Sequence, residues 1–205
     1  MQYIELHKAL KDFTVFSLWD IKSLDAAFYR RRLNEWQDRG YIKKLIKGYY
    51  VFSDLEINEN LLCEIANRIY IPSYISFETA LSYYGLIPES VYGITSVSTR
   101  RTYKFKTHIA QFSYRSIAPR LFFGYEIVRY NSKCFKIASA EKAFLDYFYI
   151  NTHIKTSTDF HSLRIDKNNF FKKVNKKKFD AFLGRFAQKK LTKRMHIFWE
   201  TIKDA

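Results

Sequence analysis

The sequence of 205 residues predicts an α+β fold, and three observations support this class. Apolar residues with helical spacing, followed by a short hairpin pattern, occupy the N-terminal quarter. Strand patterns rich in aromatic residues fill the middle of the chain. Helical apolar stripes return in a basic C-terminal tail. The length allows one large domain or two small ones, and we expect two units, residues 1–56 and residues 57–205.

The first helix is predicted over "YIELHKAL", and a second should follow Ser17, which can cap its N-terminus. This second helix should bury Leu18, Ile21 and Leu24. A third helix should begin near Asp25 and run to about Asp38, with Gly40 as the stop. Its apolar positions recur at intervals of three and four residues, which places them on one buried face. These positions are Ala26, Tyr29, Leu33 and Trp36.

Three consecutive arginines lie within this third helix. On an ideal helix Arg30, Arg31 and Arg32 fan around much of the axis, and Asn34 lies on the outward face. One or two of the arginines could then reach phosphates or guanine edges, and Asn34 could read adenine. A solvated surface is the simpler interpretation of a run of like charges.

A hairpin follows, with strands predicted at residues 42–46 and 49–52 and a tight turn at Lys47-Gly48. Three helices and then a hairpin is the order of a winged helix-turn-helix, in which the third helix enters the major groove of DNA. Such domains also serve as protein-docking modules. On the DNA-binding interpretation the contact residues are Arg30, Arg31, Arg32, Asn34, Lys43, Lys44 and Lys47.

The middle of the chain begins with a helix predicted over residues 60–70. A second helix should follow Ser76, its predicted cap, and end at Gly85. Four stretches then read as strands, and "ASAEKAFLDYFYI" reads as a helix. In the tail two apolar stripes predict folded helices and leave the basic residues exposed. These stripes are Phe179, Phe182, Leu183 and Phe186, and Leu191, Met195, Phe198 and Trp199.

Composition and charge narrow the class of protein. Hydrophobic residues make up 47% of the chain and aromatic residues 19%, which excludes a disordered composition. Lys and Arg number 35 against 20 Asp and Glu, and the net charge of +15 favours DNA, RNA or an acidic protein as partner. The N-terminus does not read as a signal peptide and no stretch is long enough for a membrane span, so we expect a cytoplasmic protein without a membrane partner.

The charge is concentrated towards the C-terminus. Residues 1–56 hold ten basic and eight acidic side chains, for a net charge of +2. Residues 57–171 hold fourteen and nine, and residues 172–205 hold eleven and three, so their net charges are +5 and +8. The first segment would therefore bind DNA through the placement of its charges rather than through bulk charge.

Two further basic surfaces are candidates for contact with nucleic acid or a protein partner. In "STRRTYKFKTHIAQFSYRS" aromatic and basic residues alternate, so one strand face can enter the core while the other forms a positive ridge. An ordinary sheet with a soluble outer face would give the same pattern. The candidate residues here and in the tail are Arg100, Arg101, Lys104, Lys106, Lys176, Lys177, Lys178, Lys189 and Lys190.

The succession "YISFETALSYYGL", basic strands, then "ASAEKAFLD" resembles the AbiEi family, the antitoxin half of type IV (AbiE-like) toxin–antitoxin systems. The resemblance extends from about residue 3 to residue 150. It implies an N-terminal winged helix that binds inverted repeats in its own promoter, and a C-terminal domain that neutralises a nucleotidyltransferase-like toxin encoded adjacently. The arginine run matches the family's basic recognition helix, and Lys43, Lys44 and Lys47 match its wing. Glu78, Glu141 and Asp146 match the family pattern, which assigns them no chemical role.

The sequence gives no pattern typical of an enzyme. Glu141 and Asp146 are five residues apart on one helix and do not share a face, and Glu141 is placed to stabilise the helix dipole. The five histidines are dispersed without the spacing of metal ligands, and no phosphate-binding glycine motif occurs. Cys63 and Cys134 read as buried free thiols. We therefore expect no catalytic residues, no metal and no cofactor.

The leading hypothesis is an AbiEi-like antitoxin that also represses its own operon. A stand-alone winged-helix regulator would share the DNA-binding segment but would have no toxin. A basic RNA-binding module, with tRNA as its partner, would use the C-terminal faces. A nuclease is disfavoured because clustered carboxylates are absent from the sequence pattern.

Overall fold

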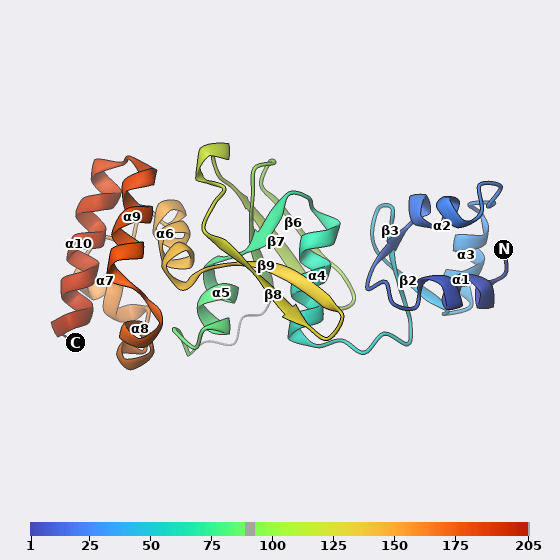
Figure 1. Cartoon of the computed structure of the whole chain (residues 1–205), viewed down its shortest axis with the longest axis horizontal. Coiled ribbons are helices and arrows are strands. Elements are labelled where there is room, and N and C mark those ends of the chain that lie inside the picture. Colours follow the sequence, from blue (N-terminus) through green and yellow to red (C-terminus); the bar gives the residue numbers. More distant parts are fainter. Residues whose placement is uncertain (89–92, 205) are drawn as a thin grey trace.

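The computed structural model describes residues 1–88 and 93–204, and it is a mixed α+β fold, as the sequence predicts. Figure 1 shows an elongated chain with the N-terminal elements at one end, a larger sheet in the centre and the last helices at the other end. No helix among the described residues is both long and apolar enough to span a membrane.

The N-terminal part contains three helices and a small antiparallel sheet whose strand order is β1-β3-β2. Strand β1 was not predicted, because two residues are too few for a periodic pattern. The elements are α1 (Tyr3–Leu10), β1 (Phe16–Ser17), α2 (Leu18–Leu24), α3 (Arg32–Asp38), β2 (Ile42–Ile46) and β3 (Tyr49–Phe52). Their side chains form a separate core cluster that includes Leu6, Phe16, Ile21, Trp36 and Tyr50.

Two local predictions in this part are confirmed. Ser17 caps α2, since its hydroxyl accepts the backbone N–H of Asp20. The Lys47-Gly48 turn joins β2 and β3, and Gly48 has a φ of +89°, which glycine adopts without the steric cost that other residues meet. Leu24 of α2 was predicted to be buried and is exposed instead.

The central sheet has six strands in the order β6-β7-β5-β4-β9-β8, so β6 and β8 are its edges. The pairs β4–β9 and β5–β7 are parallel and the remaining neighbours are antiparallel. The strands are β4 (Ser73–Ile75), β5 (Ile94–Ser98), β6 (Tyr103–Lys106), β7 (Gln111–Ser116), β8 (Tyr125–Tyr130) and β9 (Lys133–Ala138). Strand β4 was not predicted, because three residues are too few for a periodic pattern.

Helices α4 (Glu59–Ile69) and α5 (Phe77–Tyr83) contact strands of this sheet, and a short 3₁₀ helix spans Pro119–Leu121. Five helices complete the chain and stack beside one another in Figure 1: α6 (Ala140–Ile150), α7 (Ser157–Ser162), α8 (Lys167–Lys173), α9 (Lys176–Phe186) and α10 (Lys189–Asp204). The two predicted tail stripes enter the core, with Phe182 only half-buried, so the basic tail is a set of packed helices.

The N-terminal part also contacts the rest of the molecule. Val15, Leu45 and Val51 belong to the large core cluster of the central sheet and the C-terminal helices. Across the same junction the Thr14 hydroxyl donates to a buried carboxylate oxygen of Glu64 at 2.7 Å. The large core also holds Cys63, and burial raises the pKa of this thiol to about 12. The prediction that both cysteines are buried is wrong for Cys134, which is exposed on β9.

Candidate nucleic-acid interface

The predicted third helix begins later than expected, because Asp25 is engaged elsewhere. Its backbone N–H closes α2 by donating to the Ile21 carbonyl, and its side chain accepts from the Ala27 N–H at 3.1 Å and from the N-terminal amine at 3.0 Å. Helix α3 therefore starts at Arg32. The predicted start near Asp25 is wrong, and the segment between α2 and α3 is a turn-containing loop.

The shorter helix changes which residues are buried. Leu33 and Trp36 lie in the N-terminal core as predicted, but Tyr29 is 66% exposed and Ala26 is exposed as well. Phe28 takes the core position and packs against Trp36 at 5.4 Å between ring centroids. The helical spacing failed here because residues 26–29 are not helical.

The three arginines consequently differ from one another. Arg30 and Arg31 lie in the loop at the start of α3, both are exposed, and neither guanidinium has a partner among the described residues. Arg32 is half-buried, donates to the Gln2 side chain at 2.8 Å and lies 5.6 Å from the Trp36 ring centroid. The predicted fan of three arginines around one helix is therefore wrong: Arg32 holds α3 against α1, and two arginines are free.

The remaining predicted DNA-contact residues are exposed. Asn34 lies on the outer side of α3, Lys43 and Lys44 on β2, and Lys47 at the hairpin turn. In the turn between β6 and β7, burial and then the positive charge of Lys43 on the hairpin lower the pKa of His108.

That second turn belongs to the basic sheet edge. On β6 the rings of Tyr103 and Phe105 lie 5.2 Å apart, and Phe105 stacks over Phe112 of β7 at 5.6 Å. Lys104 and Lys106 are exposed as predicted, but Tyr103 is 39% exposed and Phe105 is only half-buried, so the prediction that the aromatic face enters the core is wrong for Tyr103. Arg101 is exposed beside it. Arg100 already has partners within the protein, since its guanidinium donates to the Ile71 carbonyl at 3.3 Å and lies 4.5 Å from the Tyr70 ring centroid.

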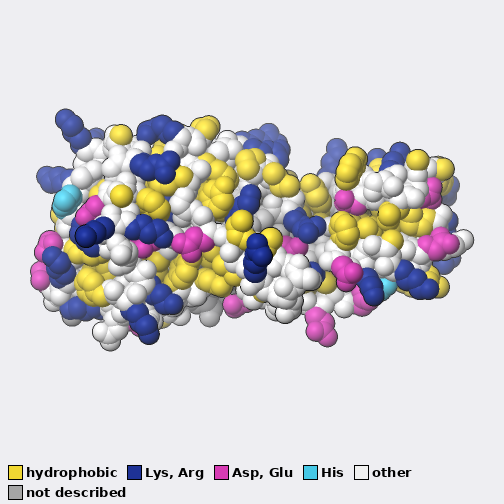
Figure 2. Space-filling model, viewed as in Figure 1, with side chains coloured by type: hydrophobic (Ala, Val, Ile, Leu, Met, Phe, Trp, Pro, Cys, Tyr) yellow, Lys and Arg dark blue, Asp and Glu magenta, His cyan; other side chains and the backbone are white. Residues whose placement is uncertain are grey.

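The basic residues of the tail also divide into free and engaged groups. Lys177, Lys189 and Lys190 are exposed. Lys176 pairs with Asp180 and lies 4.8 Å from the Trp199 ring centroid. In the view of Figure 2 the Lys and Arg side chains are spread over the helical end among Asp and Glu, and do not gather in one patch.

Two tail cations were wrongly predicted to be exposed. Lys178 is half-buried and bonds to Glu126 and to Glu141, each at 3.1 Å. Burial opposes its charged form, but these bonds prevail and raise the pKa of Lys178. Arg194 is half-buried because its guanidinium donates to three backbone carbonyls at the end of α6 and beyond, those of Phe148, Asn151 and Ile154. Both residues hold helices together.

Helix α6 carries a buried polar network that the sequence analysis missed. Lys142 and Asp146 are both fully buried and form an ion pair one helical turn apart. The Tyr74 and Ser76 hydroxyls each donate to Asp146 at 2.9 Å, and the Lys142 ammonium donates to the Tyr74 oxygen at 2.9 Å. Burial raises the pKa of Asp146 and lowers the pKa of Lys142. The network joins α6 to β4 and to the start of α5.

The network corrects two predictions about single residues. Ser76 lies at the start of α5, but its hydroxyl donates to Asp146 and makes no capping bond. Glu141 is buried rather than merely placed at the helix end: it accepts from the Ser139 hydroxyl at 2.7 Å and from the Asn175 N–H at 2.9 Å. Burial would raise the pKa of Glu141, but these bonds and Lys178 prevail and lower it.

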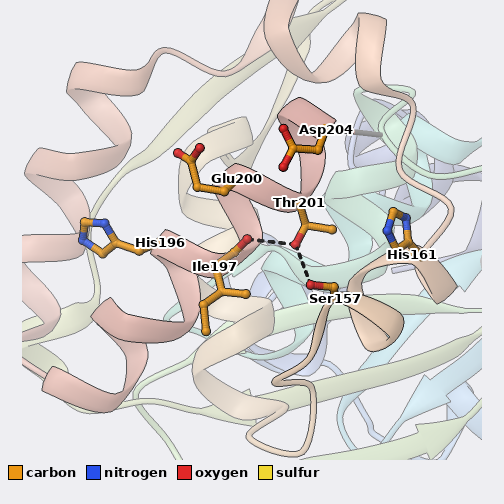
Figure 3. Close-up of a pocket in the computed structure, with 7 residues that line it drawn as sticks. All are labelled: Ser157, His161, His196, Ile197, Glu200, Thr201 and Asp204. Atoms are coloured by element: carbon orange, nitrogen blue, oxygen red, sulfur yellow. Dashed lines mark hydrogen bonds between the residues drawn. The ribbon is translucent and has the colours of Figure 1, made fainter.

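A groove between α7 and α10 brings polar side chains together. Figure 3 shows His161 and His196 on opposite sides of it, and Thr201 bonded to Ser157 at 3.2 Å and to the Ile197 carbonyl at 2.9 Å. Within residues 1–88 and 93–204, no group of three or more His, Cys, Asp or Glu side chains is arranged to hold a metal ion.

Comparison with known proteins adds no assignment: no family model matches the chain, and no curated protein matches it either. The candidate interface is therefore defined by exposure and charge alone. Its members are Arg30, Arg31, Asn34, Lys43, Lys44 and Lys47 in the N-terminal part, and Arg101, Lys104 and Lys106 on the sheet edge.

Proposed function

We propose that this protein is an AbiEi-like antitoxin whose N-terminal part is a winged helix-turn-helix. In this proposal residues 1–56 bind an inverted repeat in the promoter of the protein's own operon as a pair and repress it. Residues 57–205 counter a nucleotidyltransferase-like toxin encoded beside the gene. The protein acts in the cytoplasm and catalyses no reaction itself.

The order of elements supports the winged-helix part of the proposal. A helix, a short strand, two helices and a hairpin follow one another, and the first strand pairs with the second strand of the hairpin. In the helix-turn-helix arrangement the residues at the N-terminal end of the recognition helix contact base edges, and neighbouring segments contact the backbone. Helix α3 is the recognition helix in this proposal.

One observation carries the proposal: Arg30 and Arg31, just before the N-terminal end of α3, are exposed and have no partner within residues 1–88 and 93–204. Arg32, the next residue, is used for packing, so exposure is not a general property of this run. Arginine is the residue best suited to phosphate contacts and to bidentate bonds with guanine. Lys43, Lys44 and Lys47 extend the positive surface onto the hairpin, where they would contact the flanking phosphates.

The antitoxin part of the proposal depends on the resemblance of the motifs around α5 and α6. In the structure these motifs supply Tyr74, Ser76, Glu141, Lys142 and Asp146, all buried and all in contact with one another or with α9. These residues hold α6 against β4, the start of α5 and α9. The toxin-contact surface would lie on exposed basic residues, and Lys177, Lys189 and Lys190 are available for it.

DNA binding is tested by fluorescence anisotropy with a labelled duplex from upstream of the gene, measured over a series of salt concentrations. We expect specific binding whose affinity falls steeply with salt, because each phosphate contact adds about 0.9 to the slope of log K against log salt. Affinity that does not change with salt would contradict the proposal. Tighter binding to structured RNA than to the duplex would favour an RNA-binding module instead.

The antitoxin activity is tested by co-expression with the adjacent gene. We expect the adjacent gene to arrest growth on its own and this protein to restore it. Co-purification then separates two mechanisms: a stable complex means neutralisation by contact, and rescue without a complex means action on the toxin's substrate or product. Absence of both toxicity and rescue would leave a stand-alone transcriptional regulator.

A further inference from the structure

The two edges of the central sheet, β6 and β8, differ in the charges that they expose. The edge strand β6 carries two exposed lysines, Lys104 and Lys106. A second copy of β6 cannot pair there without bringing like charges together, and lysines on an edge strand commonly prevent such pairing. The edge strand β8 exposes one acidic and one basic side chain, Glu126 and Arg129, with Ile127 between them. Of these two edges, β8 is therefore the one that a copy of the same strand can approach.

The backbone of β8 is regular and is open on one side. All six residues of β8 pair with β9 without a register shift, and the strand contains neither Pro nor Gly. In an antiparallel ladder the N–H and C=O groups of alternate residues point away from the neighbouring strand. Within residues 1–88 and 93–204, no second strand pairs with β8, and its residues make no other backbone–backbone hydrogen bond. The outward groups of β8 are therefore free to pair with an added strand.

Exposed apolar side chains lie beside this free edge. Ile127 on β8 is 59% exposed, and Ile71, which follows α4, is 63% exposed. Both residues line the same recess next to β8, so they form one apolar patch. An exposed apolar patch is covered when a protein surface binds over it. The patch and the open backbone edge together favour an added strand of protein.

The side chains along β8 favour an antiparallel copy of the same strand. Glu126 lies in the first half of β8 and Arg129 in the second half, and Glu126 is exposed although it also pairs with Lys178. Antiparallel pairing brings the acidic half of one copy to the basic half of the other, whereas parallel pairing brings like charges together. A two-fold axis perpendicular to the sheet relates such strands, so opposed side chains lie on the same face. A pairing centred on Ile127 sets this side chain against its copy, with Ile71 beside each.

We propose that β8 pairs with β8 of a second copy of this chain, antiparallel and centred on Ile127, so that the two central sheets join into one continuous sheet. The contact closes with two copies, because both edges of each β8 are then paired. The inference goes beyond the proposed function, since it concerns the protein without DNA. A protein that forms this dimer and does not bind DNA would contradict only the DNA-binding proposal.

The test is sedimentation velocity of the full-length protein without DNA, over concentrations from about 5 µM to about 200 µM. One strand pair is a smaller contact than the interface of a stable dimer, so we expect reversible dimerisation with a dissociation constant on the order of 10–100 µM. Ile127→Lys and Ile127→Glu each set two like charges against one another across the two-fold axis. Each variant should therefore dimerise at least about tenfold more weakly. An equal mixture of the two sets Lys against Glu and should dimerise again.

Lys104→Glu, on the other edge strand, is the control and should dimerise as the wild type does. A wild-type protein that stays monomeric over this range would contradict the proposal. So would Ile127 variants that dimerise as the wild type does, or a mixture that stays monomeric. Stronger self-association of Ile127→Glu alone would set residue 127 against Arg129 of the other copy and refute the register centred on Ile127.

A second measurement needs no substitution. Hydrogen exchange of the outward β8 amides should slow as the concentration of the wild-type protein rises, because pairing engages these N–H groups. The outward amides of β6 should exchange at a rate that does not change with concentration. Exchange in β8 that is equally independent of concentration would overturn the proposal.

Discussion

The N-terminal part and the rest of the chain differ in their use of charged residues, because the second part contains a fully buried ion pair besides its exposed lysines. In residues 1–56 the basic side chains of Arg30, Arg31 and Lys43 are exposed. In the second part an entire ion pair, Lys142 with Asp146, is fully buried on α6. The first kind of charge is free to meet a partner, whereas the second kind holds elements together. Net charge alone, which is higher in the second part, does not reveal this difference.

The largest expected effect is on the buried pair. Asp146→Ala leaves the buried ammonium of Lys142 without its counter-ion and two buried hydroxyl groups without their acceptor. We therefore expect a loss of about 3–5 kcal/mol in the free energy of unfolding, measured by urea denaturation. The double variant Lys142→Met with Asp146→Leu replaces both charges by apolar groups and should be more stable than Asp146→Ala alone. A cost below about 1 kcal/mol for Asp146→Ala would show that this charge is not structural.

Two adjacent lysines sharpen the comparison within the basic tail. Lys178→Ala leaves the buried Glu141 carboxylate with one donor fewer, and we expect a loss of about 1 kcal/mol, because the ammonium itself is partly in solvent. Lys177→Ala is the matched control and should change the unfolding free energy by less than about 0.5 kcal/mol. Equal effects of the two substitutions would remove the distinction between engaged and free cations.

The same comparison applies to the arginine run. Arg32→Ala removes a bond to Gln2 and a contact with the Trp36 ring, so we expect a loss of about 0.5–1 kcal/mol of stability. Arg31→Ala should leave thermal and urea stability unchanged while weakening binding to promoter DNA. If Arg31→Ala destabilised the fold as much as Arg32→Ala, Arg31 would be a structural residue.

A smaller effect should appear in the dependence of stability on pH. The pKa of Glu141 is lowered in the folded state by its hydrogen bonds, against the effect of burial. A carboxyl group with a lowered folded pKa stabilises the fold above its unfolded pKa, near 4.5 here, and loses that contribution as the pH falls below it. We therefore expect Glu141→Gln to flatten the decline of the free energy of unfolding, measured with urea, below about pH 4.5. The exposed Glu200→Gln is the control. Parallel curves for wild type and Glu141→Gln would contradict this assignment.

The sequence predicted most of the elements but not the roles of neighbouring charged residues. The hairpin of residues 42–52 and the tail helices followed from strong local patterns, and Ser17 and Gly40 marked helix ends by their chemistry. The start of α3 was mispredicted because Asp25 has the side chain of a typical N-cap residue. Only the fold shows that it closes α2 and binds the N-terminal amine.

The buried network could not be predicted from spacing alone. Lys142 and Asp146 are four residues apart, a spacing usually found in exposed ion pairs, and their other partner, Tyr74, is 68 residues from Lys142 in the chain.

The most direct test of the central claim is to measure the affinity of the Arg30→Ala/Arg31→Ala double variant for DNA from upstream of its own gene, over a range of salt concentrations. The control is Arg129→Ala/Lys193→Ala, which removes two exposed charges from other parts of the molecule. We predict that the Arg30/Arg31 variant folds normally, binds at least about tenfold more weakly, and loses up to about 1.8 from the slope of log K against log salt, while the control matches the wild type. An unchanged affinity and an unchanged slope in the folded Arg30/Arg31 variant would contradict the claim that these two arginines form the DNA interface.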